Sequence, residues 1–326
     1  MRCIQNENLA LRAAVARLTS LSFAERLSLL KKLDNLSSLA LLSIEELCNL
    51  LSMDKSADKV AKIPDLAQLA ARAERDAFIM EQYGITMLLP GDKLYPSRLQ
   101  EISQPPFALY CRGCVEILSN DGVGVVGTRH PDGAGIKAAF SFSKDCASHG
   151  MNVVSGLAFG IDTAAHKGAL DADGGKTVAV LGCGIDTIYP AANKRLAAEI
   201  IKRSGCIVSE YPPEEPSVKW HFPERNRIIS GLTSATMVVQ APNKSGALIT
   251  ADFALEQGRD LCVHPVGVSF AEKLRGADAG SKKSDSCSEL GGILRLVEDG
   301  APVISSYEEL KALISGKMHQ GMLDLE

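Results

Sequence analysis

The sequence has few aromatic residues and no long apolar run. Phe, Trp and Tyr make up 5% of its 326 residues, and Trp occurs once. No apolar run approaches the ~20 residues that a membrane-spanning helix needs, so we predict no membrane span. The N-terminal segment has no unbroken apolar stretch and carries Arg2, Glu7, Arg12 and Arg17, which argues against a secretory signal. These absences predict a cytoplasmic protein with no membrane partner.

An excess of positive charge is missing as well. The chain has 35 basic and 39 acidic residues and a net charge of −4, so binding to nucleic acid would need a local basic patch. The nine cysteines are odd in number and scattered from Cys3 to Cys287, a pattern typical of reduced thiols in a cytoplasm. Cys111 and Cys114 form a C-x-x-C pair, but no second pair stands at metal spacing, so we expect no metal site.

Three Val-rich runs between Gly122 and Asp186 organise the chain. They alternate with segments whose apolar residues, such as Ile136 and Phe140, recur at helical spacing. This βαβαβ pattern of near-continuous apolar strands predicts a parallel sheet covered by helices on both faces. Later runs extend it to six parallel strands, and short strands near 85–89 and 107–110 lead into it. The predicted fold class is α/β, a doubly wound parallel sheet.

Composition divides the chain into three segments. Residues 1–83 have few glycines and carry leucines at spacings of three and four, which predicts a small all-helical N-terminal domain. Ser43 and Glu46 are placed as a capping box within it. Residues 84–316 hold the α/β domain, and residues 317–326 form a tail. Within the α/β domain, the polar stretch 271–288 is predicted to be a surface loop.

Glycine and hydroxyl residues gather where the predicted strands end. The carboxyl ends of such strands open onto one crevice, where helix N-termini and glycine-rich turns offer backbone N–H groups to an anion. Arg129 follows the first strand and would add a charge-assisted contact to phosphate. The residues predicted to bind phosphate in these turns are Gly127, Thr128, Arg129, Ser155, Gly156, Gly182, Ser245, Gly246 and Thr250.

Two glycine motifs fail in context. The G-x-G-x-x-G formed by Gly122, Gly124 and Gly127 lies within a strand instead of in the turn after it, and no acidic residue ends the second strand to hold a ribose. The run Gly174–Thr177 resembles a P-loop but lacks its first glycine and precedes a strand. We therefore expect no NAD, no ATP and no other cofactor.

A run of aromatic and basic residues, 220–227, precedes and enters a predicted helix. Aromatic rings stack on bases and guanidinium groups bind phosphates, the mixture typical of single-strand recognition. Lys194 and Arg195 open another helix on the same side. The predicted basic patch therefore contains Lys194, Arg195, Phe222, Arg225, Asn226 and Arg227, with Trp220 at the start of the run.

Several separate blocks resemble the DNA-processing protein A family, also called Smf. They include V-G-T-R from Val126, S-G-L-A-F-G-I-D-T-A-A-H from Ser155 and F-P-E-R-N-R-I-I from Phe222. The resemblance covers about residues 84–264. It implies an extended Rossmann fold that binds single-stranded DNA, forms a homodimer and loads the RecA recombinase during natural transformation. It also implies that Arg129, and either Lys194 or Arg195 after the Y-P-x-x-N block, contact DNA phosphates.

Two other functions remain open on the sequence. The fold also resembles the nucleoside-monophosphate phosphoribohydrolases, whose G-G-x-G-T-x-E loop corresponds to Ser245–Asp252. In this chain Ile249 replaces the glycine before the threonine, and the shorter Asp252 replaces the glutamate. Asp162 and His166 share a helix face, and the spacing favours a helix-start residue with a packed neighbour over an acid/base pair. A nucleotide-sensing module would use the crevice without the basic patch. We expect DNA binding without catalysis.

Overall fold

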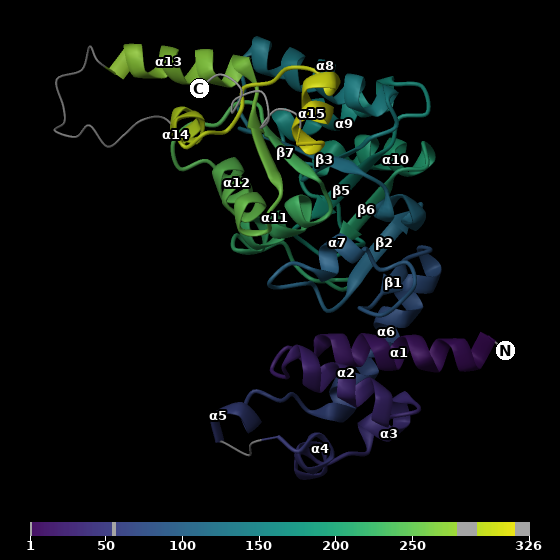
Figure 1. Cartoon of the computed structure of the whole chain (residues 1–326). Coiled ribbons are helices and arrows are strands. Elements are labelled where there is room, and N and C mark those ends of the chain that lie inside the picture. Colours follow the sequence, from purple (N-terminus) through teal and green to yellow (C-terminus); the bar gives the residue numbers. More distant parts are fainter. Residues whose placement is uncertain (1, 54–56, 279–291, 317–326) are drawn as a thin grey trace. The chain divides into compact units, whose positions relative to one another are not determined.

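The computed structural model describes residues 2–53, 57–278 and 292–316 (Figure 1). The chain divides into two compact units, Met1–Leu89 and Pro90–Glu326. The division into functional domains at residues 83 and 84 stays a prediction, because compactness alone assigns no function. Within the described residues, no helix combines the length and hydrophobicity needed to cross a membrane.

Side-chain caps begin several helices of the first unit. Side chains at the helix starts satisfy backbone N–H groups that have no partner within the helix. Ser22 and Glu25 form one capping box and Ser43 and Glu46 form another, which confirms the second as predicted. The helices are α1 (Arg2–Arg17), α2 (Phe23–Lys32), α3 (Leu36–Ala40), α4 (Ile44–Leu51), α5 (Ala57–Val60) and α6 (Leu66–Gln82), followed by β1 (Thr86–Leu88).

Apolar faces of these helices meet in a small core. Helix α6 packs against both α1 and α3, and Leu29, Leu39 and Met80 are fully buried. Asp76 of α6 is also fully buried, and its carboxylate accepts hydrogen bonds from the Arg17 guanidinium of α1. A charge-assisted pair therefore ties the first and last helices of the unit together.

The second unit contains a mostly parallel sheet. From β2 onward its strands lie in the order β2-β6-β5-β4-β3-β7-β8. Strands β3 to β8 are parallel, which confirms the six predicted parallel strands, and β2 pairs antiparallel with β6. The strands are β2 (Leu109–Gly113), β3 (Gly122–Val126), β4 (Asn152–Ser155), β5 (Thr177–Leu181), β6 (Cys206–Ser209), β7 (Ala235–Val238) and β8 (Asp260–Val263).

Helices cover both faces of this sheet, as the apolar strands require. Helices α8 (Gly133–Ser148), α9 (Ile161–Asp171) and α10 (Lys194–Lys202) pack one beside the next, and α11 (His221–Gly231) packs on α12 (Gly246–Glu256) (Figure 1). Because β3 is followed by β4 on one side and joined by β7 on the other, the sheet is doubly wound. Ligands in such sheets bind where the strand order reverses, at the carboxyl ends.

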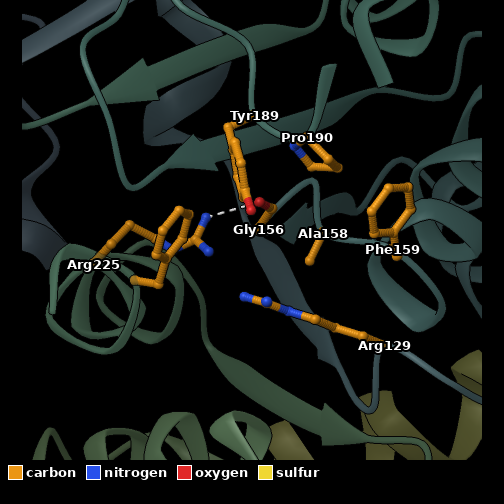
Figure 2. Close-up of a pocket in the computed structure, with 8 residues that line it drawn as sticks. Arg129, Gly156, Ala158, Phe159, Tyr189, Pro190 and Arg225 are labelled. Atoms are coloured by element: carbon orange, nitrogen blue, oxygen red, sulfur yellow. Dashed lines mark hydrogen bonds between the residues drawn. The ribbon is translucent and has the colours of Figure 1, made fainter. Parts of the chain in front are cut away.

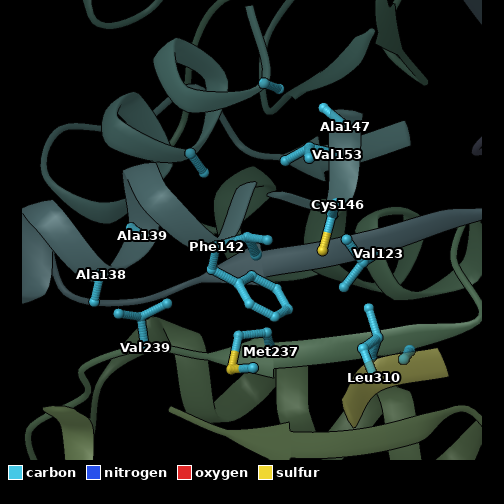
Figure 3. Close-up of a cluster of buried hydrophobic side chains, with 14 of the residues drawn as sticks. Val123, Ala138, Ala139, Phe142, Cys146, Ala147, Val153, Met237, Val239 and Leu310 are labelled. Carbon is cyan, nitrogen blue, oxygen red and sulfur yellow. The ribbon is translucent and has the colours of Figure 1, made fainter. Parts of the chain in front are cut away.

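Small and branched side chains fill the space between the sheet and α8 (Figure 3). Phe142 of α8 is 1% exposed and lies among Val123, Met237 and Leu310 in one buried cluster. Gly168 of α9 lets that helix approach α8 closely, because a Cβ there would lie 2.1 Å from the Phe140 carbonyl oxygen. Close helix packing therefore fixes where the turns before α8 and α9 stand.

The C-terminal part corrects one prediction. Helix α13 (Pro265–Asp278) occupies the first half of the stretch predicted as a loop from 271, because its apolar residues recur at helical spacing before the polar run begins. Residues 279–288 of that predicted loop lie outside the described residues. Helices α14 (Gly292–Glu298) and α15 (Tyr307–Ile314) follow. Between them, Val303 forms a parallel bridge with Val263 of β8.

Candidate nucleic-acid interface

A pocket lies at the carboxyl edge of the sheet, where the turns after β3, β4 and β5 meet the start of α11 (Figure 2). It encloses about 350 Å³, part of it open to solvent. The sequence predicted half of its lining, Arg129, Gly156, Phe222 and Arg225, and missed the other half. The missed residues are Ala158, Phe159, Tyr189 and Pro190.

The turn after β3 presents Arg129 to this pocket. The backbone N–H of Thr128 donates to the Gln240 carbonyl at 2.7 Å, which ties this turn to the one after β7. Gly127 packs so closely that a Cβ there would lie 2.5 Å from Ile161. Among the described residues, the exposed Arg129 guanidinium has no acidic partner and stands 5.7 Å from the centre of the Phe222 ring. The strand end therefore holds an unpaired positive charge over an aromatic face.

Arg225 of α11 supplies a second guanidinium to the pocket. The side chain is 4% exposed, and its Nη1 donates to the carbonyl of Gly156, at 2.9 Å, and to that of Val180. Burial lowers the pKa of Arg225 to about 10, so the group stays charged at neutral pH. Arg225, which was predicted to belong to the basic patch, is therefore buried and reaches the pocket as one of its lining residues. Its hydrogen bonds to carbonyl groups at the ends of β4 and β5 hold the side chain inside the fold.

Asp162 balances that buried charge. Its carboxylate accepts the backbone N–H groups of Gly156, at 3.1 Å, and Ala158, at 3.3 Å. Burial raises the pKa of Asp162, and the nearby Arg225 opposes that rise. The carboxylate therefore holds the turn after β4 in shape and faces away from solvent.

His166 is buried deeper and belongs to the core. The Thr177 hydroxyl donates to the Val153 carbonyl at 2.6 Å and lies 2.7 Å from His166 Nδ1, so it accepts the Nδ1 proton. Burial lowers the pKa of His166 to about 3. The ring is neutral at physiological pH, and it does not line the pocket.

Three aromatic rings also line the pocket, those of Phe159, Tyr189 and Phe222. Phe222 packs on Gly182, where a Cβ would lie 2.9 Å from the Phe222 ring. The Tyr189 ring stands 5.2 Å from it at a tilt of 47°. Phe159 and Tyr189 are 48% and 45% exposed. The sequence carried a signal for Phe159 and Tyr189, because they lie in the turns that follow the Val-rich strands β4 and β5.

Lys194 and Arg195 are exposed at the start of α10. The preceding residue, Asn193, is buried and donates to the Leu157 carbonyl at 2.8 Å and to the Thr163 hydroxyl at 2.9 Å. This side chain fastens the turn after β5 to the turn after β4. The two basic side chains therefore start from a fixed backbone beside the pocket.

Other predicted site residues take structural positions. Arg227 forms a two-pronged ion pair with Glu210, both contacts at 2.6 Å, so its charge is already matched. Asn226 donates to the Gly246 carbonyl at 3.1 Å and joins α11 to α12. The remaining three hydroxyls bond within the fold: Ser155 to the Val125 carbonyl, Ser245 to the Ala247 N–H as a helix cap, and Thr250 to the Gly246 carbonyl.

A doubly wound, mostly parallel sheet with a pocket at its carboxyl edge defines the class of the fold, which is Rossmann-like α/β. The chain belongs to the DNA recombination-mediator protein A family, whose pattern it matches over residues 86–311. Protein Smf of Synechocystis is 40% identical over 236 residues, which cover 71% of this chain and 54% of that protein. The chain thus spans about half the length of that relative.

Two solved structures share the fold. The X-ray structure of DNA processing protein A (DprA) from Streptococcus pneumoniae is similar with a TM-score of 0.66 and 30% identity, covering 91% of this chain and 95% of that one. DNA processing protein A from Helicobacter pylori, a structure that addresses the single-stranded DNA binding mode of that protein, has a TM-score of 0.57 and 26% identity, covering 73% and 97%. The predicted extended Rossmann-like fold is confirmed.

Proposed function

We propose that the second unit binds single-stranded DNA at the pocket between Arg129 and Phe222. The observation that carries this proposal is the unpaired Arg129 guanidinium standing over an aromatic ring at the carboxyl edge. A guanidinium binds a phosphate of any sequence, and aromatic rings take a base that is not paired. Duplex DNA keeps its bases stacked and does not offer them to such rings.

Three exposed basic side chains support a contact with the phosphate backbone of DNA. Arg129 at the pocket and Lys194 and Arg195 at the start of α10 are exposed, and each phosphate they contact releases counterions. The chain as a whole is acidic, so this local group has to supply the attraction. The relative from Helicobacter pylori, with its single-stranded DNA binding mode, supports the same ligand class.

The proposal includes partners that come from the family. We place the chain in the cytoplasm as a homodimer that helps load RecA recombinase onto single strands during DNA uptake and recombination. Membership of a recombination-mediator family supports this role. Sedimentation of the purified chain and capture of purified RecA test the two contacts separately. A monomer at micromolar concentration would contradict the proposed homodimer, and no capture of RecA would contradict the proposed RecA contact.

The proposed role is binding without turnover. Asp252, where a phosphoribohydrolase would carry its acid, is exposed on α12 and does not line the pocket. The buried carboxylate nearest the pocket, Asp162, is engaged by two backbone N–H groups. Release of free base from a nucleoside monophosphate, abolished by Asp252→Asn, would favour the enzyme instead.

The decisive experiment compares single and double strands. Fluorescence anisotropy is measured with a labelled oligothymidine and with a duplex of equal length, over a series of salt concentrations. We expect tighter binding of the single strand, and we expect the logarithm of the binding constant to fall linearly with the logarithm of the salt concentration. Equal affinity for duplex, or a flat salt dependence, would contradict the proposal.

A further inference from the structure

Exposed aromatic side chains of the second unit gather at one edge. Among its described residues, three Phe, Tyr or Trp side chains are largely exposed: Phe159 at 48%, Tyr189 at 45% and Trp220 at 64%. The first two line the pocket, whereas Trp220 does not. Trp220 immediately precedes α11, the helix that brings Phe222 and Arg225 to the pocket. The most exposed ring therefore stands beside the pocket without a part in it.

The indole is held by a short column of rings. Trp220 meets the His221 ring edge-on, with centroids 5.9 Å apart and planes at 82°. His221 is buried and stacks on Tyr211 at 3.8 Å, with planes 20° apart. The Tyr211 hydroxyl donates to the Glu224 carboxylate at 3.3 Å. Trp220 is thus packed against the His221 ring on one side, while most of its surface is exposed to solvent.

We infer that Trp220 is a stacking platform for a second base of the bound strand, next to the nucleotide held at the pocket. The inference rests on the proposed function. Trp220 is two residues from Phe222, so their Cα atoms are at most ~7 Å apart. Residues two apart on a helix do not face each other, so the two rings receive different bases. A single strand reaches both, because its bases turn independently once unstacked.

The surroundings of Trp220 favour a nucleic acid over a protein partner. A protein interface presents a contiguous apolar patch, but two of the three residues that precede this indole are exposed and polar. Lys219 is exposed immediately before it, and Ser217 is exposed as well, while Val218 is only partly accessible. One aromatic face next to one ammonium group matches a base and its phosphate.

Trp220 reports on its own occupancy, because it is the only tryptophan in the chain. We expect its emission to be quenched when oligothymidine binds, and to change much less with a strand of equal length that lacks bases. Trp220→Ala should weaken binding of oligothymidine about 5- to 150-fold, as expected for one stacked base. Trp220→Phe should recover most of the affinity, and neither variant should alter binding of the abasic strand.

Leu255→Ala is the matched control. Leu255 is 56% exposed and lies at the other end of α12 from the pocket edge, so its removal should leave affinity unchanged. Unaltered emission together with wild-type affinity in Trp220→Ala would overturn the platform and leave the proposed function standing. Equal loss of the base-bearing and abasic strands would show that Trp220 only shapes α11. Failure of the wild-type chain to prefer single strands would refute the proposed function itself.

Discussion

The guanidinium of Arg225 lies directly against the backbone of Gly156. Nη1 donates to the Gly156 carbonyl at 2.9 Å, and a Cβ at position 156 would stand 2.6 Å from Nη2. Arg225 is buried and donates to the Gly156 and Val180 carbonyl groups, so a shift of its guanidinium would break these hydrogen bonds. Only a residue without a side chain therefore fits at position 156 while Arg225 keeps its place in the lining of the pocket.

Gly156→Ala should damage both stability and binding. The added methyl group has to displace Arg225, and overpacking of this kind costs about 1–3 kcal/mol. We expect a lower midpoint in urea unfolding and weaker binding of oligothymidine. Gly133→Ala is the control, because a Cβ at that position of α8 meets nothing within 4 Å. Equal behaviour of the two variants would show that Arg225 adjusts freely.

Arg129→Ala should weaken DNA binding without affecting the fold. A hydrogen bond to a charged group contributes about 1.5–3 kcal/mol, and its loss should apply to every sequence alike. The salt dependence should fall by roughly one phosphate contact. Arg129→Lys should restore only part, since the ammonium lacks the planar fork. Anisotropy and thermal unfolding measure the two effects. An unfolded variant whose folded remainder binds normally would make Arg129 structural.

Arg227→Ala should act on stability. The side chains of Arg227 and Glu210 are 12% and 17% exposed, so the variant leaves a largely buried carboxylate without its partner. We expect a loss of about 1.5–3 kcal/mol in the free energy of unfolding. Arg203→Ala breaks an exposed pair with Glu199 and should cost under ~1 kcal/mol. Arg227→Ala with wild-type stability and tenfold weaker DNA binding would return Arg227 to the interface.

His166 should make stability depend on acid pH. Its pKa is about 3 in the folded chain and ~6.5 when unfolded. As pH falls through that window, the unfolded chain takes up a proton that the folded chain refuses. Stability is then lost by up to about 1.4 kcal/mol per pH unit. Asp162, whose raised pKa acts in the opposite sense, is the same in wild type and His166→Asn.

The measurement is urea unfolding at several pH values for wild type and His166→Asn. The wild-type curve should fall more steeply between pH ~6.5 and ~3, whatever the starting stability of the variant. Parallel curves would mean that His166 is protonated in the folded chain.

The sheet was predictable because its signal is local. Val-rich runs bounded by glycine mark β3, β4 and β5, and all three strands lie between Gly122 and Asp186 as predicted. The stretch from 271 was predicted to be a loop because serine and lysine dominate its second half. The apolar spacing of Val266, Phe270 and Leu274, which belongs to α13, is a weaker signal than that composition.

The site was predictable only in part, because side-chain partners are not local. Arg225 and Arg227 look alike in sequence, yet one lines the pocket and the other pairs with Glu210. Their separation depends on the ends of β4, β5 and β6, which only the folded sheet brings together. Whether Lys194 or Arg195 contacts DNA stays a prediction, since both are exposed.

The bridge between Val263 and Val303 bears on aggregation. The backbone N–H of Val263 donates to the Pro302 carbonyl at 3.0 Å, and that of Ile304 donates to the Val263 carbonyl at 3.0 Å. These bonds pair the backbone N–H and C=O of Val263 at the end of edge strand β8, which would otherwise be open to a strand from another molecule. The segment that follows α14 thus leaves less of the β8 edge free for pairing with a strand of another molecule.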